Sequence, residues 1–450
     1  MFYSDAWPFR PFFRTIDRNT SGQIKTRGRI AGLLLFFVCA LSSRAQIPDA
    51  VYSSRIQSVQ LYPSGNQLGY PIIRLGSADQ LELHFDDLDA DLKNYSYTYQ
   101  LCNADWTPAM LSHFDFIKGF SQTRISVYRN SSVALTRYTH YQATLPDRNC
   151  LPSRSGNYIL KVFLNGDTSR LIFTKRMLVV QERATVGAQV QQPFNGLYFR
   201  THQKIQFNVN LNDGLDVMNP QQQIKIAILQ NYRWDNALTT LRPTFFSRRT
   251  LEYNTENDAL FPSGKEWRWI DIRSFRFQSE RVADARYSNT ATEIFVRTDG
   301  ERTQQRFNFY RDANGRYALG PSESINPLWQ SDYATVYFSF APPGNQPYPG
   351  KDVYLFGALT NYNLGKSAKM EFNSEKGVYE TSLFLKQGYY DYMYVTIDAN
   401  DPKRAASFET TEGNLWETEN EYMILVYYRP LAGRADELIG ITRLNSLARR

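Results

Sequence analysis

Short runs of β-branched and aromatic residues with a period of two are the feature that most limits how this chain can fold. YSYTYQL (95–101), YILKVFL (158–164), KIQFNVNL (204–211) and ATVYFSF (334–340) are examples, and Gly, Pro, Asn and Asp separate such runs. Successive side chains of a strand point to opposite faces, so these runs predict half-buried strands. Apolar residues hardly recur at helical spacing, and an aromatic share of 15% suits packed sheets. We therefore predict an all-β fold.

The spacing of the runs predicts three consecutive β-sandwich domains of immunoglobulin-like or early-set type. RMLVVQERATVGAQVQQPFNG (176–196) has the pattern of a last strand, a charged joint and a first strand, and NPLWQSDYATVYFSF (326–340) has the same pattern. The predicted domains are residues 46–183, 184–325 and 326–432, each close to the size of a sandwich domain, followed by a tail at 433–450.

One dipeptide predicts a specific turn. Asn314-Gly315 lies between QQRFNFY (304–310) and RYALG (316–320). Asn-Gly between two alternating runs is a strong signal for a two-residue hairpin. We expect these two runs to pair with each other.

The first 45 residues have the pattern of a secretory signal peptide. Lys25, Arg27 and Arg29 precede the apolar run at 30–43, and Ser43-Arg44-Ala45 then provides a small-x-small cleavage site. The run has 14 residues, fewer than the roughly 20 needed to span a membrane. We expect cleavage near Ala45 and export, with a buried helix as the alternative.

Removing this leader changes the charge of the chain. The full sequence carries +7, but residues 1–45 contain seven Lys/Arg and two Asp/Glu, which leaves 44 basic and 42 acidic residues, net +2. The high isoelectric point is therefore mostly an effect of the leader. Nucleic-acid binding is not expected, because the rest of the chain lacks a strong basic excess.

Two cysteines, Cys102 and Cys150, remain after the leader. An oxidising compartment would allow a disulfide between them, and closing a loop of that length would contribute roughly 4 kcal/mol on the chain-entropy estimate. Two buried free thiols are the alternative.

Residue patterns for catalysis or metal binding are missing from the sequence. The four histidines lie in separate segments: His84, His113, His140 and His202. Neither His-x-x-x-His nor Cys-x-x-Cys occurs, so a zinc site is not expected. No pair of carboxylates stands out for glycosidase chemistry. We predict no enzyme, no catalytic, cofactor-binding or metal-binding residues, and no small-molecule substrate.

One acidic segment resembles a calcium loop in its spacing. Asp87, Asp89 and Asp91 have the spacing of the first three ligands of a calcium loop. However, Leu92 and Thr98 occupy the positions where such a loop needs glycine and glutamate. An acidic turn between two strands is the better interpretation.

The third predicted domain contains a strand that is interrupted by a glycine. VYLFGALTNYN (353–363) is followed by MEFNSEKGVYETSLFL (370–385) and GYYDYMYV (388–395). This order resembles the early-set domains of the glycogen-binding type. Members of that group that hold glycans stack an indole on the sugar, and Tyr362 occupies the corresponding position here. The resemblance leaves two roles open for Tyr362, namely glycan binding and packing under its loop.

The most distinctive segment is LYPSGNQLGYPIIRLGSADQLELHFDDLDADLKNYSYTYQLCNADWTPAML (61–111), which continues into IKGFSQTRISVYRNSSVALTRYTHYQATLP (117–146). Together with NYRWDNA (231–237) and GKEWRWID (264–271), it closely resembles the plug proteins of the Bacteroidetes type IX secretion system. The resemblance implies a periplasmic protein, associated with the outer membrane, that works without catalysis or cofactor. Its implied partner is the giant outer-membrane translocon barrel, whose periplasmic opening it blocks when no cargo is engaged. A periplasmic or surface glycan-binding protein that uses the third domain is the alternative.

Aromatic and arginine side chains in loops are typical anchors of protein interfaces. Trp106, Tyr232, Arg233 and Trp234 are the candidates on this chain. The alternative is that each tryptophan fills the core of its own domain.

Overall fold

The computed structural model describes residues 49–402 and 404–448. Strands dominate these residues, and the helical segments among them are single turns: α1 (His113–Phe116), α2 (Pro220–Gln223), α3 (Pro327–Gln330) and the 3-10 turns η1 (Pro343–Asn345) and η2 (Ala358–Thr360). The all-β prediction is confirmed. The predicted leader with its cleavage near Ala45 lies outside the described residues.

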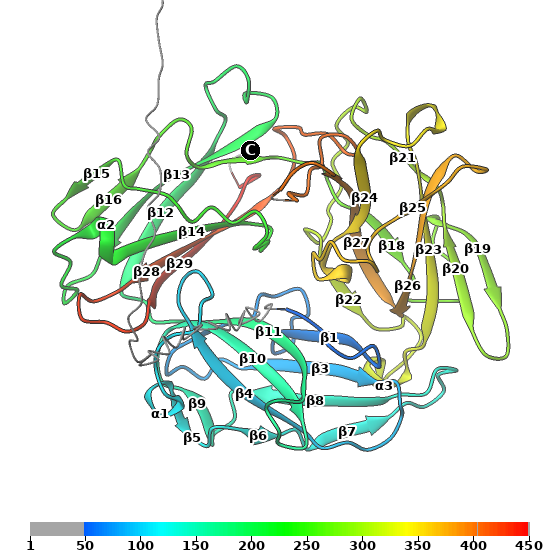
Figure 1. Cartoon of the computed structure of the whole chain (residues 1–450), viewed down its shortest axis with the longest axis horizontal. Helices are drawn as coiled ribbons and strands as arrows, with labels where there is room; N and C mark the ends of the chain where they lie inside the picture. Colours follow the sequence, from blue (N-terminus) through cyan, green and yellow to red (C-terminus); the bar gives the residue numbers. More distant parts are fainter. Residues whose placement is uncertain (1–48, 403, 449–450) are drawn as a thin grey trace, which may run out of the picture. The chain divides into compact units, whose positions relative to one another are not determined.

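The first sandwich has two sheets, with strand orders β1-β3-β8-β7 and β2-β11-β10-β4-β6, and a short ribbon β5-β9 (Figure 1). Its strands are β1 (Ile56–Pro63), β2 (Ile72–Arg74), β3 (Leu81–Asp87), β4 (Tyr95–Cys102), β5 (Ile117–Gly119), β6 (Thr123–Arg124), β7 (Val127–Asn130), β8 (Thr139–Leu145), β9 (Cys150–Pro152), β10 (Gly156–Leu164) and β11 (Leu171–Val180). Leu83 and Phe85 of β3 point into the core, where the ring of Phe85 stacks on Tyr141 with centroids 5.2 Å apart. His84 and Asp86 alternate with them and therefore face the other side of the sheet.

The second sandwich is built from two separate stretches of sequence. One sheet has the order β12-β13-β16-β15, with β17 also paired to β13, and the other has the order β14-β28-β29. Its strands are β12 (Ala184–Gln191), β13 (His202–Leu211), β14 (Ile224–Gln230), β15 (Phe245–Ser247), β16 (Thr250–Tyr253), β17 (Leu260–Pro262), β28 (Glu421–Tyr428) and β29 (Glu437–Asn445). Figure 1 shows the red strands β28 and β29 beside the green β14. Both sheets contribute to one core, which includes Phe207, Ile228 and Ile424.

This pairing corrects the predicted boundaries. The segments 184–325 and 326–432 do not coincide with sheets, because β28 pairs with β14 over the full length of β14. The predicted tail at 433–450 contains β29, which is a strand of the second sandwich. The reason is physical: alternation marks a strand but carries no information about which distant strand completes its sheet.

The third sandwich lies in the sequence between β17 and β28. One sheet has the order β18-β27-β22 with β24 also on β27, and the other has the order β19-β20-β23-β26-β25 with β21 on β23. Its strands are β18 (Arg268–Asp271), β19 (Val282–Tyr287), β20 (Thr292–Val296), β21 (Asp299–Gly300), β22 (Tyr317–Leu319), β23 (Tyr333–Ala341), β24 (Lys351–Phe356), β25 (Glu371–Asn373), β26 (Val378–Lys386) and β27 (Gly388–Asp398). Val336, Leu355 and Tyr392 are fully or almost fully buried in its core.

The hairpin predicted at Asn314-Gly315 is not formed. Both residues have positive φ angles, +54° and +80°, as a tight turn requires. However, residues 304–310 contain no strand, and β22 pairs with β27 instead. The buried carboxylate of Asp391 on β27 accepts the backbone N–H groups of Ala313 and Gly315 at 2.6 and 3.1 Å, which binds the turn to that strand.

The glycine that interrupts VYLFGALTNYN ends β24. Gly357 has a φ of +154°, and a Cβ at this position would lie 2.9 Å from the carbonyl oxygen of Asp391. A side chain would therefore clash with β27. The loop then turns through Asn361 and Tyr362, whose φ angles are +51° and +53°.

An apolar cluster joins the first sandwich to the second. We call it the apolar joint, and its buried members are Tyr70, Leu178, Val180, Ala227, Leu229, Met423, Leu425, Tyr427 and Leu438. Two backbone hydrogen bonds run beside it, from the N–H of Gln181 to the oxygen of Leu438 at 3.0 Å and from Arg183 to Ile439 at 2.8 Å.

Candidate functional site

Three of the four predicted interface residues contact one another inside the chain. The rings of Trp106 and Trp234 meet edge to face with centroids 4.8 Å apart, and the guanidinium of Arg176 lies over both, at 4.9 and 5.4 Å. Tyr232 stacks on Tyr70 at 4.4 Å. Trp106, Tyr232 and Trp234 are half-buried against the apolar joint. They connect two sandwiches of this chain, and neither tryptophan fills the core of its own sandwich.

Arg233 is buried, with 3% of its surface exposed. It binds Asp235 through two hydrogen bonds of 2.6 and 3.2 Å, and its guanidinium lies 4.9 Å from the rings of Phe356 and Phe408 in the third sandwich. The prediction that Arg233 faces a partner is wrong, because these contacts already bury it. Sequence could not distinguish the two cases, since joints within a chain and interfaces between chains use the same anchor residues.

Cys102 and Cys150 are free and buried, so the structure contradicts the disulfide hypothesis. Cys150 belongs to the core of the first sandwich together with Leu101 of β4. Cys102 follows Leu101 and therefore points to the other face of the sheet. Burial raises the pKa of the Cys102 thiol to about 12 and that of Cys150 to about 11, so both stay protonated.

The three aspartates with calcium-loop spacing surround a lysine. The ammonium of Lys93 lies 2.8 Å from Asp87 and 3.2 Å from Asp91, and it also contacts Asp89. Among the described residues, these three aspartates lie close enough together to hold a cation. The ammonium of Lys93 already contacts all three. The arrangement supports the interpretation as an acidic turn.

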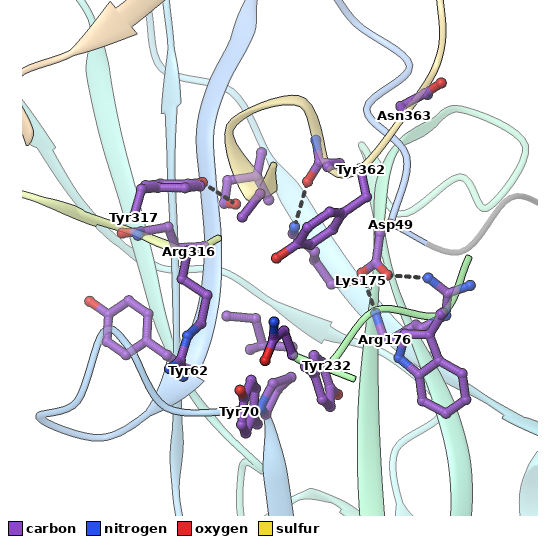
Figure 2. Close-up of a pocket in the computed structure, with 18 of the residues that line it drawn as sticks. Asp49, Tyr62, Tyr70, Lys175, Arg176, Tyr232, Arg316, Tyr317, Tyr362 and Asn363 are labelled. Atoms are coloured by element: carbon purple, nitrogen blue, oxygen red, sulfur yellow. Dashed lines mark hydrogen bonds and ion pairs between the residues drawn. The ribbon is translucent and has the colours of Figure 1, made fainter. Parts of the chain in front are cut away.

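A cavity of about 430 Å³ lies where the three sandwiches meet (Figure 2). Each sandwich contributes side chains to its wall: Tyr62, Tyr70 and Lys175 from the first, Tyr232 and Trp234 from the second, and Arg316, Tyr317 and Tyr362 from the third. The rings of Tyr70 and Tyr232 lie side by side in it.

Tyr362 forms part of this wall. Its hydroxyl donates to the carbonyl oxygen of Gly315 at 3.2 Å, and its ring meets Phe356 and Trp267 at 5.4 and 6.4 Å. The residue therefore packs under its loop, which was one of the two roles left open by the sequence.

Two of the charged groups around the cavity form an ion pair, and a third bonds to a neutral amide. Asp49 binds Arg176 at 2.5 Å, and Lys175 donates to the side-chain oxygen of Asn361 at 3.0 Å (Figure 2). Burial opposes ionisation of Asp49, but the charges of Arg176 and Lys175 overcome it and lower the pKa of Asp49. Arg316 donates to the carbonyl oxygen of Ala313 at 2.8 Å and lies over the ring of Tyr70 at 4.6 Å.

A second cluster, which is ionic, joins the first sandwich to the third. We call Asp86, His140, Tyr333 and Lys386 the ionic joint, and each is at most 2% exposed. One oxygen of Asp86 accepts from Lys386 and from Tyr333, both at 2.5 Å, and the other accepts from His140 at 2.6 Å. Burial opposes ionisation of Asp86, but the charge of Lys386 and the bond from His140 lower its pKa.

His84 extends this joint toward the surface. Its Nδ1 lies 3.1 Å from Nε2 of His140, and its Nε2 lies 3.4 Å from Glu82. Burial and the neighbouring His140 lower the pKa of His84 to about 4. His140 donates its Nδ1–H to Asp86, so its Nε2 is an acceptor when the ring is neutral. When both imidazoles are neutral, the hydrogen bond between them therefore runs from Nδ1–H of His84 to Nε2 of His140.

Sequence analysis missed the ionic joint. The segment that could have indicated it is QLELHFDD (80–87). In this segment Glu82, His84 and Asp86 share one face of β3, opposite to the face of Leu83 and Phe85. A polar face normally indicates solvent, so the pattern gave no reason to expect that another sandwich covers it.

A family model matches the first part of the chain. Residues 56–181 match the model described as the type 9 secretion system plug protein 1st domain. The match spans β1 to β11, which is the whole first sandwich. The chain belongs to the family of type IX secretion system plug proteins. The plug-family segment contains Asp86 and His140, which are half of the ionic joint.

A solved structure supports the fold of this plug-family member over most of its length. The crystal structure of a hypothetical protein from Parabacteroides merdae ATCC 43184 has 32% sequence identity and a TM-score of 0.84. The alignment covers 89% of this chain and 100% of that chain. The search of curated proteins gave no match. Among the helices that the structure describes, none has the length and apolar character to cross a membrane.

Proposed function

We propose that this chain is a periplasmic plug that blocks the periplasmic opening of the outer-membrane translocon of the type IX secretion system when no cargo is engaged. It acts by binding the translocon barrel, without catalysis, after export and removal of its leader near Ala45. The observation that carries the proposal is the family match over the complete first sandwich.

The joints between the sandwiches are consistent with such a role. A body that fills an opening must resist separation of its parts. Separating the first and third sandwiches would break the contacts of Asp86 with Lys386 and Tyr333. Separating the first and second would expose Leu178, Leu229 and Leu425 to water, which is unfavourable by about 25 cal/mol for each Å² of apolar surface.

The test is a permeability measurement in the native envelope. Deleting the gene in a strain whose barrel lacks bound cargo is expected to admit large antibiotics that the outer membrane normally excludes. Complementation with the wild-type chain should restore exclusion, and a Leu92→Ala chain, changed at an exposed position, should do the same. The tagged mature protein should also co-purify with the barrel. Unchanged permeability together with no co-purification would refute the proposal.

A further inference from the structure

One sheet of the first sandwich ends in an exposed strand. β7 is the last strand of the sheet β1-β3-β8-β7, and all four of its residues are exposed (Figure 1). The strand at the opposite edge, β1, is mostly buried, and the third sandwich contacts it. The hydroxyl of Tyr317 donates to the carbonyl oxygen of Val59 at 3.4 Å, and the hydroxyls of Ser58 and Tyr333 lie 2.8 Å apart. β7, in contrast, is an edge that no described element covers.

The hydrogen-bond register shows which backbone groups of β7 point outward. The N–H of Ser131 donates to the oxygen of Tyr138 at 2.8 Å, in register with the pairs between β7 and β8. Bonded and non-bonded pairs alternate along an antiparallel ladder. Tyr128 and Asn130 lie an odd number of residues before Ser131, so their N–H and C=O groups point away from β8 and bond to no described residue. A row of such groups is a template for a further strand.

Exposed arginines surround this edge. The segment 117–137 contains four Lys/Arg and no Asp/Glu. Arg129 lies on β7, Arg124 lies three residues before it, and Arg137 lies in the loop between β7 and β8. All three are exposed, and none forms an ion pair with a described carboxylate. Arg124 bonds to the amide oxygen of Asn94 at 2.5 Å, which is neutral.

The carboxylates beside the edge are already bonded. Asp332 of the third sandwich accepts the backbone N–H groups of Leu135 and Thr136 at 2.7 and 2.9 Å. Asp91 lies 3.2 Å from the ammonium of Lys93. The arginines of the edge therefore keep their charge available for a partner.

Backbone and charge together indicate the occupant. Free N–H and C=O groups on a sheet edge bind an extended peptide as an added strand. Exposed arginines favour a peptide that carries carboxylates. A second copy of this edge fits poorly, because the same arginines would face one another and like charges opposite each other in a sheet repel.

We propose that β7 accepts an extended acidic segment of the translocon as a fifth strand of the sheet β1-β3-β8-β7. The segment bonds to the outward backbone groups of Tyr128 and Asn130, and its carboxylates contact the arginines. Its apolar side chains cover Val127 and Tyr128, which are 47% and 44% exposed. The edge lies within residues 56–181, which match the plug family. The partner's identity rests on the proposed function, whereas the chemistry of the edge does not.

The first experiment is a calorimetric titration of the mature chain with the peptide acetyl-Glu-Val-Thr-Val-Glu-Val-amide and with the same peptide carrying lysine in place of glutamate. The acidic peptide should saturate and bind about tenfold more tightly than the basic one. Asn130→Pro removes an outward N–H without removing a bond to β8, and it should weaken binding at least about tenfold. Asn130→Ala keeps that N–H and should bind like the wild type. Arg129→Glu should reduce the preference for the acidic peptide, whereas Arg129→Lys should preserve it.

Equal affinities for the two peptides would overturn the inference, and so would no binding of the acidic peptide. Binding that Asn130→Pro leaves unchanged would also overturn it. Amide hydrogen exchange of residues 126–131 should slow in the complex, and protection confined to another part of the chain would contradict the proposed site. A dimer in sedimentation that Asn130→Pro dissociates would assign the edge to a second copy instead. Circular dichroism and melting of each variant show that the fold is retained.

Co-purification separates this inference from the proposed function. If the barrel co-purifies equally with the wild type and with Asn130→Pro, the translocon does not use this edge, and the plug function stands. If the barrel fails to co-purify even with the wild type, the plug function falls, and the titration still decides whether the edge binds an acidic strand.

Discussion

The apolar joint and the ionic joint connect the first sandwich to its two neighbours by different physics. The apolar joint is built on buried aliphatic and aromatic side chains, mainly leucines and tyrosines. The ionic joint centres on a carboxylate with no exposed surface, which a lysine, a tyrosine and a histidine surround.

The difference determines how each joint responds to change. Apolar contacts contribute in proportion to buried area and depend little on pH. A buried charge pair depends on every partner, because desolvation of one charge must be offset by the other. The apolar joint should therefore tolerate conservative substitutions and acidic pH, whereas the ionic joint should tolerate neither.

The largest expected effect is that of removing one charge from the ionic joint. Lys386→Met leaves Asp86 buried without its cation and should lower the free energy of unfolding by about 3–5 kcal/mol. The double variant Asp86→Asn with Lys386→Met should recover part of this loss. Urea unfolding measures both, and equal losses for the single and double variants would show that the two residues do not act as a pair.

A core truncation in the apolar joint should have a slightly smaller effect. Leu425→Ala should lower the free energy of unfolding, measured with urea, by about 2–4 kcal/mol, and the decrease should be the same at pH 5 and pH 7.5. Leu92→Ala, at a position that is 60% exposed, is the matched control and should stay within about 0.5 kcal/mol. A loss at Leu425 that varied strongly with pH would contradict the distinction between the joints.

Acid should weaken the ionic joint through His84. Its pKa is near 4 in the folded chain and about 6.5 when unfolded. The unfolded state therefore binds more protons between these values, so the stabilisation is complete above about pH 6.5 and is lost as the pH falls toward 4. We expect the free energy of unfolding, measured with urea, to decrease by about 1–3 kcal/mol as the pH falls across this range. His84→Gln should flatten the profile, and an unchanged slope in that variant would assign the effect to other groups.

The smallest expected effect concerns Cys102 and Cys150. Because both thiols are free, a reducing agent should change the free energy of unfolding by less than about 0.5 kcal/mol, whereas loss of a disulfide would cost about 2–5 kcal/mol. In the chain without residues 1–45, which contain Cys39, a thiol reagent should detect two groups after unfolding and almost none before it. Absence of free thiols in the unfolded, unreduced chain would show that the bridge forms after all.

Sequence predicted local structure well where it depends on neighbours along the chain. The runs around Tyr99, Leu160 and Phe338 are strands, and the loop after β24 begins at Gly357 as expected. The plug family was recognised mainly from residues 61–111 and 117–146, which fall within the matched segment, and also from residues 231–237 and 264–271, which lie outside it. The site residues were predicted less well, because Arg233 and Tyr362 have the right chemistry for binding but use it within the chain.

The amino-acid sequence by itself determined that this chain forms strands and which side chains share a face of each strand, because a period of two is a property of the extended backbone. Only the tertiary structure decided that β28 and β29 return to complete the sheet of β14, and that a neighbouring sandwich buries the polar face of β3. Both outcomes depend on contacts between residues hundreds of positions apart, and a local pattern carries no information about which distant surface will cover it.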